Sequence, residues 1–263
     1  MFPYIDIFGF QLPTYGLTSL LGTFLAGFVI FRLSQKRGVD KLYLGFTAVA
    51  AGVGLFIGAH LLYGITRTQD IVQAFGSYSA FDGFFDFAQH IISLFSGMVF
   101  YGGLYGALGA GMMVAAKRKA PIGDMCDLFA VFAPLFHIFG RIGCFLAGCC
   151  YGVSWEYGIS GRMVAEGVRE HTKRFPVQLL EAGLLAVLFL VIYVLFIKGK
   201  NKGNLLYLYL AVYAVLRFFL EFLRGDEIRG RLWVFSTSQW ISIITLLWVG
   251  IFLFVRKIKK QKT

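Results

Sequence analysis

Residues 176–197 read PVQLLEAGLLAVLFLVIYVLFI, and this stretch decides the class of fold. Its one charged residue is Glu181, and the rest is almost wholly apolar. A helix needs roughly 20 mostly apolar residues to cross the hydrocarbon core of a bilayer. The stretch is therefore predicted to be a transmembrane helix.

Similar apolar runs recur along the chain, and they predict about seven transmembrane helices. The 263 residues are 58% hydrophobic and only 15% charged, which excludes an ordinary soluble domain. Since no internal repeat or appended soluble domain is visible, we expect an all-α integral membrane protein with a single transmembrane domain over residues 1–263. The expected spans lie near residues 13–31, 43–65, 88–116, 122–147, 176–197, 204–223 and 237–255.

The third of these runs, residues 88–116, is long and contains several glycines, among them Gly97, Gly102, Gly103 and Gly106. Two interpretations stay open for it. It is either one tilted helix or two pieces joined at membrane depth. A broken helix is tolerated at that depth only where it faces protein or a cavity.

The basic residues predict the orientation of the chain. Its net charge is +11, which in a soluble protein would suggest a nucleic-acid partner. Here the basic residues form clusters between apolar runs, so we expect no nucleic acid and instead contact with a membrane. Because cytoplasmic loops carry the excess of Lys and Arg, we expect the N-terminus outside and the C-terminus inside. The clusters lie near residues 32–41, 117–119, 198–202 and 256–262.

Several ionisable residues fall inside the apolar spans. Such a residue costs a few kcal/mol and by default indicates a functional site. Arg217, Glu221 and Arg224 are spaced four and three residues apart, and His137 and Arg141 four apart, so each set shares a helix face. Mutual pairing would explain one ion pair. The excess of arginine over acid favours a site for an anion, and a lipid phosphate is the obvious one at that depth.

Six short segments carry a resemblance to a known family. They are TYGL at 14–17, YGGLYG at 101–106, GRIGCFLAGCCYG at 140–152, FPVQLLE at 175–181, RFFLEFLR at 217–224 and STSQ at 236–239. In this order they resemble the prolipoprotein diacylglyceryl transferases of bacterial inner membranes. The resemblance implies an enzyme that moves a diacylglyceryl group from phosphatidylglycerol to the lipobox cysteine of a preprolipoprotein, releases glycerol phosphate and uses no cofactor.

The resemblance also implies roles for individual residues. Arg141 and Arg217 would hold the lipid phosphate and stabilise charge on the leaving group, and Glu221 and Arg224 would orient them. Tyr101 completes the expected catalytic set. The expected substrate-binding residues are Tyr15, Gly102, Gly103, Cys144, Cys149, Gly152, Gln178, Tyr213 and Arg224.

Some positions differ from the pattern of the family. Tyr101 and Phe175 each stand where the family has a histidine, and Cys144 and Cys149 where it has Asn and Glu. A tyrosine with its ordinary pKa near 10 is a weak base at neutral pH. His137 is the alternative base for the acceptor thiol, although a lone histidine in a span is more often a hydrogen-bonded structural group.

Three cysteines, Cys144, Cys149 and Cys150, crowd one segment and allow three interpretations. Free cysteines are most often buried as small apolar residues. A thiol near Arg141 would be more reactive, because positive charge favours the thiolate. A metal site with His137 is the third interpretation, but no recognised zinc spacing is present, and we therefore expect no metal.

Other functions compete with the transferase. A divergent member of the family would use another thiol or hydroxyl as the acceptor. A lipid or anion transporter would also use arginines within its spans. A membrane thiol-redox protein would be expected to carry a Cys-x-x-Cys pair, which the adjacent Cys149 and Cys150 do not form.

Overall fold

The computed structural model describes most of the chain, in two compact units. The first unit comprises Met1–Lys36 and Gly123–Thr263, and the second comprises Arg37–Ile122. The described residues are 2–7, 9–97, 100–117, 121–160, 163–165, 168–170, 173–225, 231–232 and 234–261.

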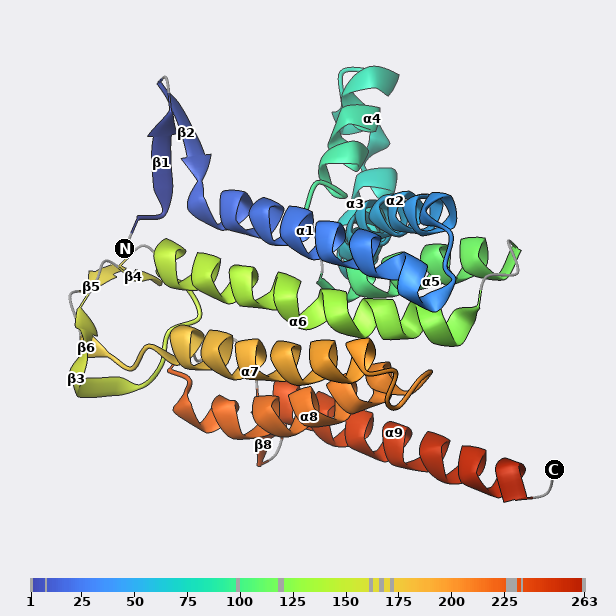
Figure 1. Cartoon of the computed structure of the whole chain (residues 1–263). Helices are drawn as coiled ribbons and strands as arrows, with labels where there is room; N and C mark the ends of the chain where they lie inside the picture. The colour runs from blue at the N-terminus through green and yellow to red at the C-terminus, as the bar shows by residue number, and fades with distance from the viewer. Residues whose placement is uncertain are drawn as a thin grey trace. The chain divides into compact units, whose positions relative to one another are not determined.

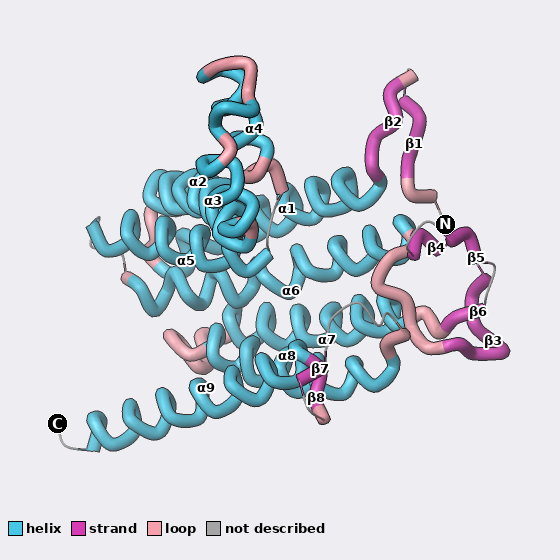
Figure 2. Tube along the Cα trace, turned by 180° about the vertical axis from the view of Figure 1, so that it is seen from behind, coloured by secondary structure: helices cyan, strands magenta, loops and turns pink. Residues whose placement is uncertain are grey.

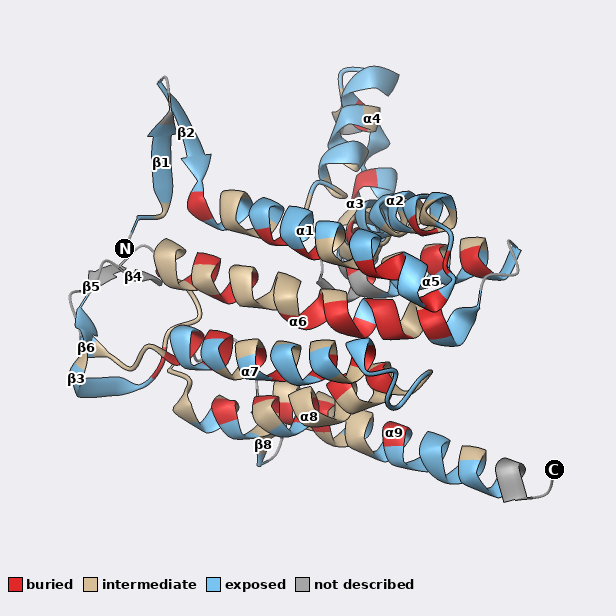
Figure 3. Ribbon diagram, in the orientation of Figure 1, coloured by how far each residue is buried: buried red, intermediate tan, exposed pale blue. Residues whose placement is uncertain are grey.

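Long helices form most of the first unit. Figures 1 and 2 show α6, α7 and α8 side by side from opposite faces, and α9 packs against α8. Figure 3 shows that buried positions gather along α6, from Asp124 to Cys144. Short 3-10 turns follow α1, at Ser34–Arg37, and α8, at Glu221–Leu223. The helices are α1 (Thr14–Leu33), α6 (Ile122–Ala147), α7 (Val177–Ile197), α8 (Leu205–Leu220) and α9 (Thr237–Gln261).

Short antiparallel ribbons precede or connect these helices. The sequence predicted an all-α fold and did not predict these ribbons. Each has two strands and is too short to produce a long apolar run, so the search for spans does not detect it. Those after residue 150 lie in the connections from α6 to α7 and from α8 to α9. The pairs are β1 (Tyr4–Ile7) with β2 (Phe10–Pro13), β3 (Ser154–Ser160) with β6 (Lys173–Arg174), β4 (Met163–Ala165) with β5 (Val168–Glu170), and β7 (Arg231–Leu232) with β8 (Phe235–Ser236).

The second unit is built on one close helix pair. Helices α2 and α5 pack through glycines: a Cβ at Gly102 would overlap the carbonyl oxygen of Gly58, and one at Gly54 would overlap that of Gly106. Small residues at such spacing let two backbones approach closely inside a membrane. The helices of this unit are α2 (Lys41–Thr66), α3 (Thr68–Gly76), α4 (Phe84–Ser93) and α5 (Phe100–Lys117), with a 3-10 turn at Tyr78–Ala80.

The expectation of a multi-pass membrane protein is confirmed. Among the described residues, six helices are long and apolar enough to cross a bilayer, namely those at α1, α2, α6, α7, α8 and α9. The run at 88–116 is divided between two helices, α4 and α5, with turns at 94 and 95 after α4. It is therefore not one tilted helix, and a junction at membrane depth stays a prediction. The exact number of spans and the direction of the termini stay predictions, and the basic residues Arg118, Lys119 and Lys262 lie outside the described residues.

Asp127 fixes one end of the helices in the first unit. Its carboxylate oxygens accept hydrogen bonds from the backbone N–H groups of Gly203, at 2.7 Å, and Leu205, at 3.0 Å, where α8 begins. An acid at a helix N-terminus satisfies free N–H groups and the helix dipole. This buried acid near the start of α6 is therefore structural. It lies at the end of the bundle that carries the basic residues 198–202.

Candidate active site

Glu181 joins three helices near the other end of the first unit. Its Oε1 lies 2.9 Å from Nη2 of Arg141 on α6 and accepts a hydrogen bond from the Tyr213 hydroxyl on α8 at 3.2 Å. The glutamate residue is only 1% exposed and Arg141 8%. A buried carboxylate with two such partners holds the Arg141 guanidinium in one orientation. The sequence singled out Glu181 only as a charge within a span, although it ends the family-like segment at 175–181.

Glu221 lies between the other two arginines. Its Oε2 is 2.6 Å from Nη2 of Arg217 and 3.9 Å from Nε of Arg224, as the spacing of four and three residues predicted. The same Nη2 of Arg217 donates a hydrogen bond to Oγ of Ser238 on α9, at 3.0 Å. Ser238 was missed as a site residue, and its signal was the family-like segment at 236–239.

These six side chains form what we call the arginine site: Arg141, Glu181, Tyr213, Arg217, Glu221 and Arg224. Tyr213 interacts electrostatically with both Arg141 and Arg217, which places the two guanidinium groups in one neighbourhood. Three guanidinium groups stand against two carboxylates. The arginine site therefore keeps one uncompensated positive charge, which suits an anion.

Two guanidinium nitrogens of the arginine site lack a partner. Within the described part of the chain, Nε of Arg141 and Nη1 of Arg217 are buried and make no hydrogen bond. A buried polar donor left unpaired costs about 1–3 kcal/mol, and more when it is charged. Two such donors indicate that an acceptor from outside the chain completes the arginine site. A phosphate group offers the required oxygens and charge.

His137 lies beside the arginine site. It is one turn before Arg141 on α6, and its ring packs edge-on against Tyr213 with a centroid distance of 5.0 Å. It also interacts electrostatically with Arg141, Glu181 and Arg217. His137 therefore has charged neighbours on three helices, and its role as a base stays a prediction.

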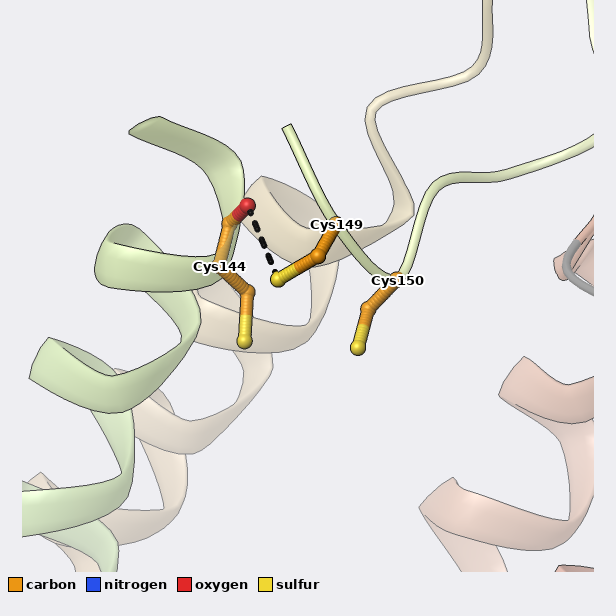
Figure 4. A group of neighbouring side chains, drawn as sticks. All are labelled: Cys144, Cys149 and Cys150. Carbon is orange, nitrogen blue, oxygen red and sulfur yellow. Dashed lines mark hydrogen bonds between the residues drawn. The ribbon is translucent and has the colours of Figure 1, made fainter. Parts of the chain in front are cut away.

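Cys144, Cys149 and Cys150 form what we call the thiol cluster, which Figure 4 shows. Their three Sγ atoms all lie within 4.8 Å of one another, and none is joined in a disulfide. The Cys149 thiol faces the Cys144 carbonyl oxygen at 3.6 Å. The neighbouring thiols of Cys144 and Cys149, together with the guanidinium of Arg224, lower the pKa of Cys150.

A tight turn after α6 brings the three thiols together. Gly148 has φ +76° and Cys150 has φ +57°, so the chain passes twice through the left-handed region. The backbone N–H of Cys149 bonds the Cys144 carbonyl at 3.0 Å, and Gln178 on α7 donates from Nε2 to the Cys149 carbonyl at 2.8 Å. Gln178, predicted to bind substrate, thus holds the turn that carries the thiols.

Two further predicted residues border this region. Tyr15 is the second residue of α1 and lies against α6 at Gly143, where an added Cβ would lie 3.2 Å from its ring. Gly152 lies where three segments meet: its N–H bonds the Phe175 carbonyl at 3.2 Å, and it forms a β-bridge with Arg224. An added Cβ at Gly152 would overlap the Phe175 carbonyl oxygen. Gly152 therefore has a packing role.

The chain matches the family model described as prolipoprotein diacylglyceryl transferase over residues 3–256. This chain belongs to that family. It is 31% identical to the phosphatidylglycerol–prolipoprotein diacylglyceryl transferase of Clostridium tetani, with 97% of this chain and 98% of the relative covered. A second relative, phosphatidylglycerol–prolipoprotein diacylglyceryl transferase 2 of Clostridium perfringens, is 30% identical, with 98% and 96% covered. The resemblance seen in the sequence is confirmed, and the family is one of transferases.

The remaining residues expected from the diacylglyceryl transferase family lie in the second unit. Tyr101, Gly102 and Gly103 follow one another on α5. The Tyr101 side chain lies outside the described residues. Gly102 and Gly103 are buried against α2, where a Cβ at Gly103 would lie 3.3 Å from Leu55 Cγ. Their backbone thus serves helix packing, and their part in catalysis or substrate binding stays a prediction.

Proposed function

We propose that this protein transfers the diacylglyceryl group of phosphatidylglycerol to the cysteine thiol of a preprolipoprotein. The observation that carries the proposal is the pair of buried nitrogens, Nε of Arg141 and Nη1 of Arg217, that have no hydrogen-bond partner among the described residues. They belong to a site with one uncompensated positive charge, and the phosphodiester of phosphatidylglycerol carries one negative charge. The names of the two relatives give the reaction: each is a transferase that uses phosphatidylglycerol as the donor of the diacylglyceryl group.

The reaction requires the same two arginines to stabilise negative charge that develops on the phosphate. A thiolate forms a bond to the glyceryl carbon next to the phosphate, and the carbon–oxygen bond breaks. The electron pair leaves with glycerol phosphate, so charge on the phosphate increases in the transition state. Guanidinium donors fixed in advance stabilise that increase. Glu181 and Glu221 keep Arg141 and Arg217 oriented, since each carboxylate lies within 3 Å of a guanidinium nitrogen.

Other residues have proposed roles around the arginine site. Tyr213, Arg224 and Tyr15 would line the lipid headgroup and glyceryl region. His137 is the proposed candidate in the first unit for accepting the proton of the acceptor thiol. Tyr101, in the second unit, stays a candidate for that role through the family resemblance alone. The proposed membrane is the bacterial cytoplasmic membrane, with the arginine site toward the outer leaflet, because the basic loops favour the cytoplasm for the opposite end. The partners are then phosphatidylglycerol and the lipobox segment of a preprolipoprotein.

One assay tests the proposal. Membranes with the overproduced protein are incubated with phosphatidylglycerol labelled in its diacylglyceryl part and a lipobox peptide, with a Cys→Ser peptide as the control. We expect label on the cysteine peptide and an equal amount of glycerol phosphate released. Release without labelled peptide would favour another acceptor. Lipid binding with neither label transfer nor release would contradict a transferase and favour lipid transport.

A further inference from the structure

We propose that Cys144, Cys149 and Cys150 bind a zinc ion whose fourth ligand is the thiol of the acceptor. The first half concerns metal binding by this chain. The second half rests on the proposed function, since it names the substrate atom that completes the site.

The distances between the thiols suit a single ion. Zinc binds cysteine sulfur at about 2.3 Å in tetrahedral geometry, which separates two sulfur ligands by about 3.8 Å. The three Sγ atoms already lie within 4.8 Å of one another. Side-chain rotations that move the sulfur atoms by about an ångström would therefore complete a three-sulfur site. The sequence predicted no metal because residues five and one apart match no common zinc spacing, whereas the turn after α6 brings their thiols together.

The backbone of the turn gives an independent argument. Cys150 has φ +57°, and a non-glycine residue in the left-handed region costs about 1–3 kcal/mol. A cysteine that served only packing would not need this conformation. Gln178, which is 2% exposed, holds the carbonyl of Cys149 from α7. The turn is therefore fixed by a neighbouring helix in the shape that places three sulfurs together.

The surrounding charges fit a metal thiolate. Three thiolates and one Zn²⁺ carry a net charge of minus one, which would balance the excess positive charge of the arginine site. The lipid phosphate would then be held by the nitrogens of Arg141 and Arg217 that lack a hydrogen bond within the described residues. The Arg224 guanidinium interacts with the Cys150 thiol, and Arg141 interacts electrostatically with both Cys144 and Cys150. The thiol cluster thus adjoins the arginine site. An ion held there would lie next to the bound phosphate of the lipid.

An ion with three protein ligands keeps an open fourth position, as catalytic zinc sites do. A thiol that enters this position loses its proton to water, because a coordinating thiol is deprotonated. The bound thiolate then forms the sulfur–carbon bond while the carbon–oxygen bond breaks and its electrons leave with glycerol phosphate. The thioether product is a weaker ligand and is released. Such a site activates the acceptor without the histidine that Tyr101 replaces.

The metal content of the purified full-length protein tests the first half. We expect about one zinc ion per chain, as in a single tetrahedral site. In Cys144→Ser, Cys149→Ser and Cys150→Ser the zinc should fall at least tenfold. Cys126→Ser, which changes the one cysteine outside the thiol cluster, is the control that should retain zinc. Helix content by circular dichroism checks that each variant folds. Zinc-free wild-type protein, or a disulfide between two of the three cysteines, would overturn the proposal.

Cobalt substitution tests the second half. Co²⁺ in the thiol cluster should give a sulfur-to-cobalt charge-transfer band, and a lipobox peptide should shift its visible bands whereas the Cys→Ser peptide should not. An unchanged spectrum with the cysteine peptide would overturn the fourth-ligand role and leave a structural ion. Label transfer by zinc-free cysteine variants would overturn the fourth-ligand role and leave the proposed function intact. Zinc binding without any label transfer in the wild type would overturn the proposed function and the fourth-ligand role that rests on it, and would leave metal binding by the three cysteines.

Discussion

Nη2 of Arg141 lies 2.9 Å from Oε1 of Glu181, and both side chains are buried between α6 and α7. The pair holds a cation inside an otherwise apolar bundle. It also leaves Nε of the same guanidinium unpaired. The pair therefore has two consequences that can be measured separately, one for stability and one for activity.

For stability, we expect Glu181→Gln to lower the free energy of unfolding by about 3–5 kcal/mol, because it leaves a buried arginine uncompensated. Denaturation in detergent measures the change. Asp70→Asn is the matched control, since it removes the partner of Arg67 in an exposed pair with side chains 49% and 41% exposed. That control should cost about 1 kcal/mol or less. Equal effects of the two changes would contradict a buried structural ion pair.

For activity, Arg217→Lys should slow the release of glycerol phosphate by about 100-fold or more, because a lysine keeps the charge but loses the planar fork of donors. The measurement is the rate of release from labelled phosphatidylglycerol. Arg67→Lys, at an exposed position in the second unit, should leave the rate unchanged. A rate near that of the wild type in Arg217→Lys would rule out a geometric clamp on the phosphate.

Removal of the Tyr213 hydroxyl is expected to have a smaller effect on stability than removal of the Glu181 charge. Tyr213→Phe removes the hydrogen bond to Glu181 at 3.2 Å but keeps the ring that packs on His137. We expect a loss of about 1 kcal/mol in stability, the ordinary value of one hydrogen bond. Tyr193→Phe on α7, whose ring packs against Phe189, is the control. The midpoint of thermal unfolding compares the two, and identical midpoints would contradict a stabilising hydroxyl.

The glycine contact between α2 and α5 is tested by two alanines on one helix. Gly102→Ala should destabilise the second unit, because its Cβ would overlap the backbone of Gly58. Gly109→Ala should be neutral or stabilising, since nothing lies within 4 Å of its Cβ and alanine favours a helix. The midpoints of thermal unfolding of the two variants are compared with that of the wild type. An unchanged midpoint for Gly102→Ala would disprove close packing at Gly102.

The sequence predicted those features that depend on local spacing. Except for the run at 88–116, which is divided between α4 and α5, the apolar runs predicted the long helices to within a few residues of their ends. Arg217, Glu221 and Arg224 share a face because helical periodicity places residues three and four apart together. Each of these inferences needs only one segment of chain.

Features that depend on two segments were not predictable in the same way. The partner of Arg141 is Glu181, on the next helix, and no spacing within one helix identifies that pair. Ser238 reaches Arg217 from α9 for the same reason. The thiol cluster was visible as a crowded segment. Its closeness in space depends on the left-handed turn at Gly148 and Cys150, which spacing alone does not reveal.

The junction at Gly152 limits how this protein can vary. Val153 bonds the Leu223 carbonyl, and the N–H of Gly225 bonds the Tyr151 carbonyl, so the ends of α6 and α8 are tied by main-chain atoms. Such ties do not depend on which side chains lie on either side of the glycine. The main-chain ties themselves would therefore persist if the side chain of Val153 changed. Gly152 itself cannot be replaced in the same way, because even one methyl group there would overlap the carbonyl oxygens of Phe175 and Leu223 and separate the segments that meet at this glycine.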